Sequence, residues 1–213
     1  MQNLGKIKNI IFDLGGVILN IDYQLTVAAF KEIRFDGFEN AYSQSAQHQL
    51  FDNLETGFIS PQEFRDGIRK VAQKDLSDVE IDYAWNKIIL DLPADRISLL
   101  KQLKTRYRSF LLSNTNKIHY DVYAADLLKL AANGFNDIFE KAYFSHEIHL
   151  RKPDLKVFEM VLQEKQLIPA ETLFIDDSIQ HIEAAKQLGI CCHLLQPPQD
   201  ITELFDKNFR LLI

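Results

Sequence analysis

Short apolar runs alternate with amphipathic stretches over most of the chain, and this rhythm predicts the secondary structure. The first run, residues 7–12, ends in three consecutive apolar residues, as expected for a parallel strand that is buried on both faces. Asp13 follows at once, and a carboxylate there is tolerated only at the carboxyl end of the strand, where open α/β sheets bind ligands. Gly15 and Gly16 then permit a tight bend and a close approach of the backbone.

The segment from residue 22 to residue 92 carries helix signals and no convincing strand. Ser60 and Ser77 each open a capping box with a glutamate three residues later, and Leu92-Pro93 breaks the helical pattern off. Four amphipathic helices with short connections predict a small helical bundle. They are expected at residues 23–35, 41–54, 61–72 and 77–89.

From residue 93 onward, predicted helices and strands alternate, which indicates a parallel sheet covered on both faces. The fold class is therefore α/β, a Rossmann-like parallel sheet with an inserted four-helix domain. We expect the sheet domain at residues 1–20 and 93–213 and the insert at residues 21–92. The further strands are expected at 109–112, 142–144, 171–175 and 190–195, and the helices at 96–107, 120–132, 154–166, 179–188 and 202–209.

Composition narrows the possible partners. The 213 residues carry a net charge of −6, so the chain has no lysine and arginine excess with which to neutralise a nucleic acid. Cys191 and Cys192 are adjacent in an apolar run, which predicts two buried thiols without a disulfide and a reducing compartment. The sequence shows neither a signal peptide nor a stretch long enough to cross a bilayer, so we expect a cytoplasmic protein. Oligomeric state is not readable from the sequence.

Polar residues follow the predicted strands at four points. In a parallel sheet these ends face the same way, so the groups can converge on one crevice. Three carboxylates placed together would repel one another, and a hard cation such as Mg2+ would resolve the conflict. The lysine, the hydroxyl and the amide would then supply donors to phosphate oxygens. The residues are Asp13, Ser113 with Asn114, Lys152, and Asp176 with Asp177.

In this order, the clusters resemble the four motifs of the haloacid dehalogenase-like (HAD) hydrolase superfamily. The resemblance covers the whole sheet domain, and the insert stands where that family places its type I cap. Three short sequence segments most resemble those of the subgroup that contains bacterial alpha-D-glucose-1-phosphate phosphatase. They are residues 12–15, 112–116 and 151–154.

The resemblance implies an Mg2+-dependent phosphatase of a small phosphorylated metabolite, such as a sugar phosphate. It gives Asp13 the role of nucleophile, which forms an aspartyl-phosphate. It assigns Mg2+ to Asp13, the carbonyl of Gly15 and Asp177, with Asp176 adjacent, and it leaves open which of the last two binds directly. Ser113 and Asn114 would bind phosphate, and Lys152 would neutralise both Asp13 and phosphate.

One position departs from the family pattern. Most phosphatases of the superfamily carry an aspartate as general acid and base where this chain has Gly15. Either the leaving group departs without a proton, or another group such as Asp22 takes over, or the protein binds phosphate without turning it over. The alternatives are therefore a non-catalytic phosphate-binding protein and a metal-independent dehalogenase, although the pair Asp176-Asp177 favours phosphoryl chemistry. A phosphonatase would need a cap lysine, and no lysine of the insert (Lys31, Lys70 and Lys74) carries a recognisable signature.

Other polar residues have a simpler interpretation. His146 and His149 have metal-like spacing without a partner set, so we expect them at the surface or in loops. His181 stands near a predicted helix start, and Asp22 is equally consistent with capping the helix 23–35 and with facing the site. Acidic and amide residues of the insert indicate either a polyhydroxylated ligand or a solvated face. These are Asp52, Asn53 and Glu55.

Overall fold

The computed structural model of the protein describes residues 4–35, 37–39 and 49–213, and its centre is a parallel sheet of five strands. The strand order is β3-β2-β1-β4-β5, so β1 lies in the middle, with Phe12 opposite Leu111 on one side and Ile175 on the other. All four residues of β1 are buried, which confirms the predicted strand. The strands are β1 (Asn9–Phe12), β2 (Arg108–Ser113), β3 (Lys141–Phe144), β4 (Thr172–Asp176) and β5 (Cys191–Leu194).

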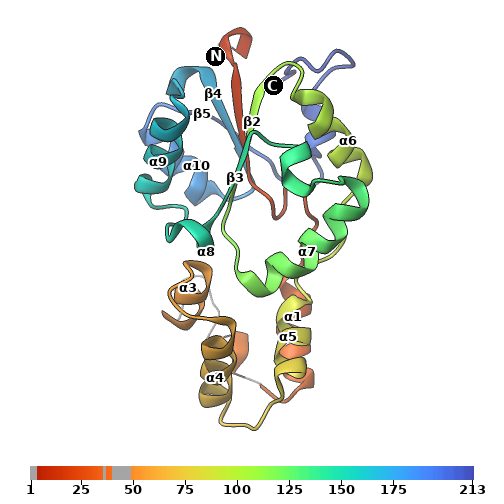
Figure 1. Ribbon diagram of the computed structural model, residues 1–213, viewed down its shortest axis with the longest axis vertical. Coiled ribbons are helices and arrows are strands. Elements are labelled where there is room, and N and C mark those ends of the chain that lie inside the picture. Colours follow the sequence, from red (N-terminus) through yellow and green to blue (C-terminus); the bar gives the residue numbers. More distant parts are fainter. Residues whose placement is uncertain (1–3, 36, 40–48) are drawn as a thin grey trace.

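Helices cover both faces of the sheet, as predicted. Because side chains alternate along a strand, Ile10 and Phe12 face α6 (Ala94–Leu103) and α7 (Lys117–Leu130), whereas Ile11 faces the opposite layer. That layer consists of two helices on the other side of the sheet in Figure 1. They are α9 (Leu155–Lys165) and α10 (Ile179–Gln187), and short 3-10 turns complete the fold at Leu4–Lys6, Gly134–Asp137, Pro169–Glu171 and Ile201–Leu204.

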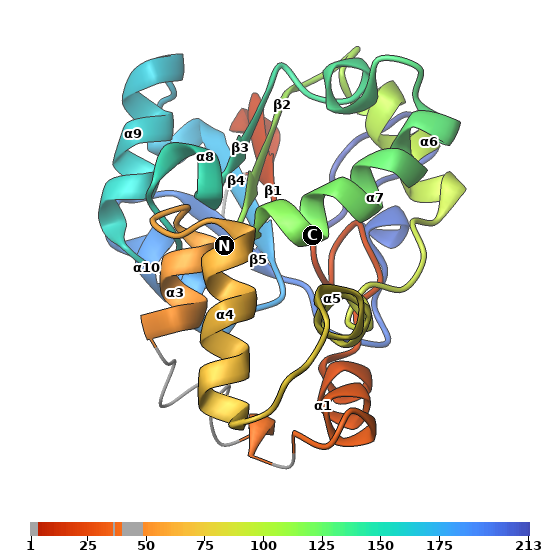
Figure 2. The same cartoon turned by 60° about the horizontal axis from the view of Figure 1, so that its bottom comes forward.

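A helical insert between β1 and β2 lies beyond the carboxyl ends of the strands (Figures 1 and 2). Its interior is aromatic, with Phe30, Phe51, Phe64 and Trp85 each at most 2% exposed. This confirms the fold class with an inserted helical cap. Residues 41–48 of the second predicted helix lie outside the described residues. The described cap helices are α1 (Tyr23–Glu32), α3 (Gln49–Glu55), α4 (Pro61–Ala72) and α5 (Asp78–Asn86).

The local helix signals in the insert correspond to real caps. Ser60 and Ser77 form the two predicted capping boxes, each with the glutamate at the third helical position. Asp22 caps α1, because its side chain accepts the N–H of Gln24 at 2.8 Å. Of the two roles left open for Asp22, the structure therefore shows the capping one.

Two predictions about the fold are wrong, and one short helix was missed. The expected helix 202–209 is only the 3-10 turn Ile201–Leu204, because Phe205 is extended and pairs with Leu211 as the chain folds back. The four-residue helix α8 (Ser145–Ile148) was not predicted, since one turn is too short to show a periodicity. The cysteines are free, as expected, but both are half-buried rather than buried because β5 is an edge strand.

The sequence predicts that no segment crosses a membrane. Among the described residues, none of the helices combines the length and the apolar character needed to span a bilayer.

Candidate active site

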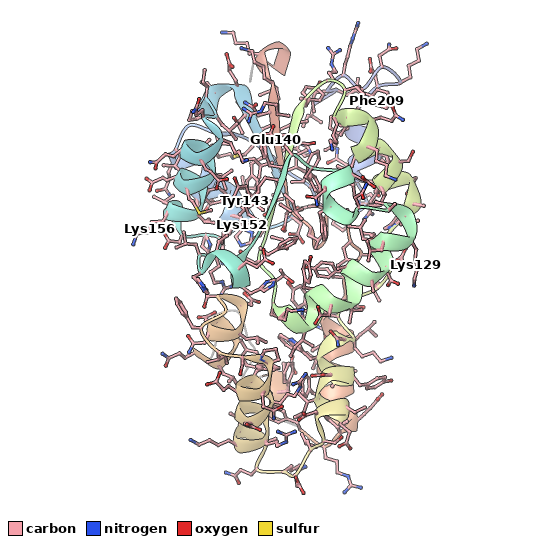
Figure 3. All side chains as sticks on the ribbon, viewed as in Figure 1. Lys129, Glu140, Tyr143, Lys152, Lys156 and Phe209 are labelled. Carbon is pink, nitrogen blue, oxygen red and sulfur yellow. The ribbon has the colours of Figure 1, made fainter. Side chains whose placement is uncertain are left out.

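A cavity of about 880 Å3 lies where the carboxyl ends of the strands meet the cap. Loops after β1, β2 and β4 line it from the sheet side, and α1 and the end of α3 line it from the cap side. Figure 3 shows Lys152 at the end of the sheet that faces the cap helices. Every residue that the sequence placed at this edge, except Asp176, lines the cavity: Asp13, Gly15, Ser113, Asn114, Lys152 and Asp177.

One lysine at the cavity joins two buried carboxylates. The Nζ atom of Lys152 lies 2.7 Å from Oδ1 of Asp13 and 2.7 Å from Oδ2 of Asp176, and the lysine is 0% exposed. Burial alone would lower the pKa of Lys152, but the two carboxylates outweigh it and raise that pKa, so the side chain stays charged. The ammonium therefore offsets the charge of both carboxylates at the adjacent ends of β1 and β4.

The two adjacent aspartates after β4 have different surroundings. Asp176 is 0% exposed and accepts hydrogen bonds from Lys152, from the Ser178 N–H at 2.8 Å and from Nδ1 of His181 at 2.9 Å. Asp177 instead lines the cavity. His181 thus orients Asp176, and the oxygens of Asp176 are already engaged by protein donors.

These surroundings shift the carboxylate pKa values in opposite directions. Burial, reinforced by Asp176 and Asp177, raises the pKa of Asp13 well above its usual range, although Lys152 opposes the shift. Burial would also raise the pKa of Asp176, but Lys152 and His181 outweigh it and hold that pKa below its usual range. Burial and the neighbouring Asp176 raise the pKa of Asp177 to about 6. The cavity end therefore carries carboxylates that a nearby cation would stabilise in their charged form.

The oxygen atoms at this end fit a hard divalent cation. Asp13 and Asp177 line the cavity together with Gly15, and Mg2+ prefers one or two carboxylates with further oxygen ligands. A second group, Asp13, Asp176 and His181, brings its ligand atoms within 4.8 Å of one another, but Lys152 already occupies its two carboxylates. We therefore consider the first set the better match to the cation.

Two glycines follow Asp13 at the site, and only the first of them lines the cavity. Gly16 has a φ of +72°, and a Cβ there would lie 2.7 Å from Cγ of Asp177 and closer still to its Oδ2. A Cβ at Gly15 would lie 3.1 Å from the flexible end of Ile21, with no positive φ. Gly16 thus allows Asp177 to approach the backbone after β1, and Gly15 leaves no carboxylate at the position of the usual acid.

Ser113 and Asn114 end β2 beside the lysine. Ser113 is 2% exposed and, among the described residues, its hydroxyl makes only a long contact of 3.5 Å with the Asn114 carbonyl. The Asn114 side chain accepts the Lys152 N–H at 2.9 Å and donates to the Lys152 carbonyl at 2.8 Å. The side chain of Asn114 therefore holds the lysine loop, and the Ser113 hydroxyl remains available to a ligand.

Sequence reasoning missed the contacts between cap and sheet domain. Arg151 pairs with Asp52 and, through Nη2, with Oε2 of Glu55 at 3.1 Å. His149, in the loop after α8, donates from Nδ1 to the Thr56 carbonyl at 2.7 Å. The arginine directly before Lys152 was the available signal, but no local pattern pairs it with the insert.

A second contact joins α5 to the start of α7. Asn116 caps α7 with its Oδ1 and presents its amide to Nδ1 of His119 at 3.0 Å, while Nε2 of His119 donates to the Trp85 carbonyl at 3.0 Å. The imidazole also stacks on Trp85, with ring centroids 4.7 Å apart. Burial lowers the pKa of His119 to about 4, so the ring is neutral in this contact.

Known proteins similar to this chain include a phosphatase and a HAD family enzyme. D-ribitol-5-phosphate phosphatase of Bacteroides thetaiotaomicron is 31% identical over 183 residues, which cover 86% of this chain and 89% of that protein. A HAD family enzyme of the same organism, in complex with magnesium and inorganic phosphate, is 38% identical with a TM-score of 0.86, covering 94% of this chain and all of that one. An L-2-haloacid dehalogenase of Xanthobacter autotrophicus, 18% identical with a TM-score of 0.60 over 89% of this chain and 77% of that one, shares the fold alone.

The family model of haloacid dehalogenase-like hydrolases matches residues 7–189, which include β1 to β4 and the site residues that follow them. The chain therefore belongs to the haloacid dehalogenase-like hydrolase family.

Proposed function

We propose that the protein is an Mg2+-dependent phosphatase of a small phosphorylated metabolite. The observation that carries this proposal is the buried Asp13–Lys152–Asp176 cluster, with Asp177 and Gly15 lining the same cavity as Asp13. A relative of 38% identity in complex with magnesium and inorganic phosphate supports it.

The reaction would use Asp13 as nucleophile. One carboxylate oxygen of Asp13 forms a bond to phosphorus as the bond between phosphorus and the leaving oxygen breaks, and the leaving oxygen takes its proton from water. A water molecule then hydrolyses the aspartyl-phosphate to release phosphate. Lys152 offsets charge on Asp13, and the Ser113 hydroxyl and the Asn114 backbone N–H donate to phosphate oxygens. We assign Mg2+ to Asp13, Asp177 and the Gly15 carbonyl, with Asp176 behind them; when bound, the ion would neutralise charge on the phosphate oxygens.

A relative supports the proposed substrate class, and Gly15 supports the expected rate. D-ribitol-5-phosphate phosphatase, at 31% identity, makes a polyol phosphate our preferred substrate. The resemblance to alpha-D-glucose-1-phosphate phosphatase stays a prediction. With Gly15 in place of an aspartate, we expect slow turnover, because general acid–base help typically contributes about 100- to 10,000-fold.

We also propose that residues 21–92 act as a cap domain that closes the site, and that residues 1–20 and 93–213 form the catalytic core. The contacts of Arg151 and His119 with the cap support this division. Cytoplasmic location stays a prediction, as does the absence of nucleic-acid partners.

Phosphate release from a panel of phosphates would test the proposal. With Mg2+, the purified protein should release phosphate from polyol and sugar phosphates, and Asp13→Asn should abolish the release. Asp22→Asn is the matched control, since Asp22 caps α1 and asparagine caps equally well. Release that persists in Asp13→Asn would exclude this nucleophile, and metal-independent halide release by the wild type would favour dehalogenase chemistry.

A further inference from the structure

A cap carboxylate shares the cavity with the proposed nucleophile. Glu55 is the last residue of α3 and lines the cavity that Asp13 lines from the opposite side. Its side chain is only 17% exposed, although it carries a charged group. Arg151 stands beside it, with Nη2 of the arginine 3.1 Å from Oε2 of the glutamate. The guanidinium holds this carboxylate at the cavity wall.

The Glu55 carboxylate has unused capacity to accept hydrogen bonds. Its Oε2 atom is buried, and within the described part of the chain no donor makes a hydrogen bond to it, because the Arg151 contact is an ion pair without hydrogen-bond geometry. Buried acceptors without a donor are rare, since they lose their hydration without compensation. Because Oε2 itself is closed to the cavity, a ligand donor would meet the other carboxylate oxygen, on a side chain that is 17% exposed and lines the cavity.

The neighbouring Asp52 provides a comparison. Asp52 lies three residues earlier on α3 and pairs with the same Arg151, yet it does not line the cavity. The two carboxylates therefore share a structural partner, but only Glu55 is placed to meet a ligand. Holding the cap against Arg151 does not by itself require a carboxylate inside the cavity.

The charges around Glu55 favour an uncharged ligand group. The described lining residues with a permanent positive charge are Arg151 and Lys152, and each is already paired with two carboxylates. A second phosphate or a carboxylate on the substrate would meet Glu55 at close range. Hydroxyl groups, in contrast, donate to a carboxylate and need no countercharge.

We propose that Glu55 is a specificity-determining residue that accepts hydrogen bonds from hydroxyl groups of the leaving group. The substrate then carries a single phosphate on an otherwise uncharged polyhydroxyl chain. Tyr23 and Gln24 of α1 line the same wall and add uncharged polar groups for the same purpose. This inference rests on the proposed phosphatase function.

The test compares substrates that do and do not offer hydroxyl groups. The kcat/KM values of wild type, Glu55→Gln, Glu55→Ala and Asp52→Asn are measured with Mg2+ on D-ribitol 5-phosphate, p-nitrophenyl phosphate and 2-phosphoglycolate. For the polyol phosphate we expect a loss of about 10-fold in Glu55→Gln and about 100-fold in Glu55→Ala, because a hydrogen bond to a charged acceptor is lost. The aryl phosphate should change less than about twofold. The preference against the carboxylate of 2-phosphoglycolate should weaken, and Asp52→Asn should resemble wild type.

Each other outcome has a defined meaning. Equal losses on polyol and aryl phosphates in Glu55→Gln, or the same loss in Asp52→Asn, would show a structural role and overturn the inference while the phosphatase function stands. A wild type that hydrolyses none of the substrates would overturn the proposed function and the inference with it. If Glu55→Ala does not fold by circular dichroism, Glu55→Gln and Glu55→Asp carry the same comparison.

Discussion

Replacing Gly16 with alanine should displace the carboxylate of Asp177. The new Cβ would lie 2.7 Å from Cγ of Asp177, whereas non-bonded carbon atoms prefer about 3.5–4.0 Å, so the carboxylate must move by roughly 1 Å. Alanine must also adopt the positive φ of +72°, which costs about 1–2 kcal/mol. If Asp177 holds the cation, a shift of this size should lower activity about 100-fold, as misplacements of 1 Å do elsewhere.

The assay is phosphate release as a function of Mg2+ concentration, together with urea unfolding. Gly15→Ala is the matched control, because its Cβ meets only the flexible end of Ile21, at 3.1 Å, and its φ is not positive. Gly16→Ala should need at least about 10-fold more Mg2+ for half-maximal activity, and Gly15→Ala should not. If both variants require the same Mg2+ concentration as wild type, Asp177 does not hold the cation and the assignment is refuted.

Three further predictions concern charge. Lys152→Met leaves the buried carboxylates of Asp13 and Asp176 without their ammonium partner, so the free energy of unfolding in urea should fall by about 3–5 kcal/mol and recover in part with Mg2+. An unchanged unfolding midpoint would show that Lys152 does not stabilise these carboxylates. The pKa of His119 is about 4 in the folded protein and near 6.5 in the unfolded chain, so the unfolded chain binds more protons. The free energy of unfolding should therefore fall by about 2 kcal/mol from pH 7 to pH 5, and it should fall less in His119→Gln. Burial raises the pKa of Asp177 to about 6 and that of Asp13 further, so calorimetric Mg2+ affinity should weaken as the pH falls and both groups take up protons; a pH profile that is unchanged in Asp177→Asn would exclude Asp177 as a ligand.

Much of the fold follows from local patterns that the sequence displays directly. The strand that precedes Asp13 was readable because burial on both faces leaves an apolar run. The caps at Ser60 and Ser77 were readable because a side chain satisfies backbone groups only three residues away. The end of the chain was not readable, because the apolar residues around Phe205 pack on the core as a folded-back segment with the spacing of a helix.

The candidate site was predictable where the topology alone brings residues together. Asp13, Lys152 and Asp176 each follow a strand or its loop, and parallel strands place those ends at one edge. The different surroundings of Asp176 and Asp177 were not predictable, since adjacent residues look alike until their donors are known. The pairing of Arg151 with Glu55 depends on how the cap docks, and no local pattern encodes that contact.

The cap contacts and the proposed catalytic cluster are linked by a single peptide bond. Lys152 is paired with carboxylates of the sheet, including Asp13, and Arg151 is paired with carboxylates of the cap, including Glu55. Consecutive Cα atoms are about 3.8 Å apart, so this dipeptide limits how far the two acidic groups can separate while both ion pairs persist. A substrate with phosphate at one end and hydroxyl groups at the other would therefore contact Asp13 and Glu55 at the same time, and the adjacent residues Lys152 and Arg151 limit the distance between these two carboxylates. If the cap opens as proposed, the Arg151 pairs with Asp52 and Glu55 must break, whereas the Lys152 pairs lie within the sheet domain and can persist.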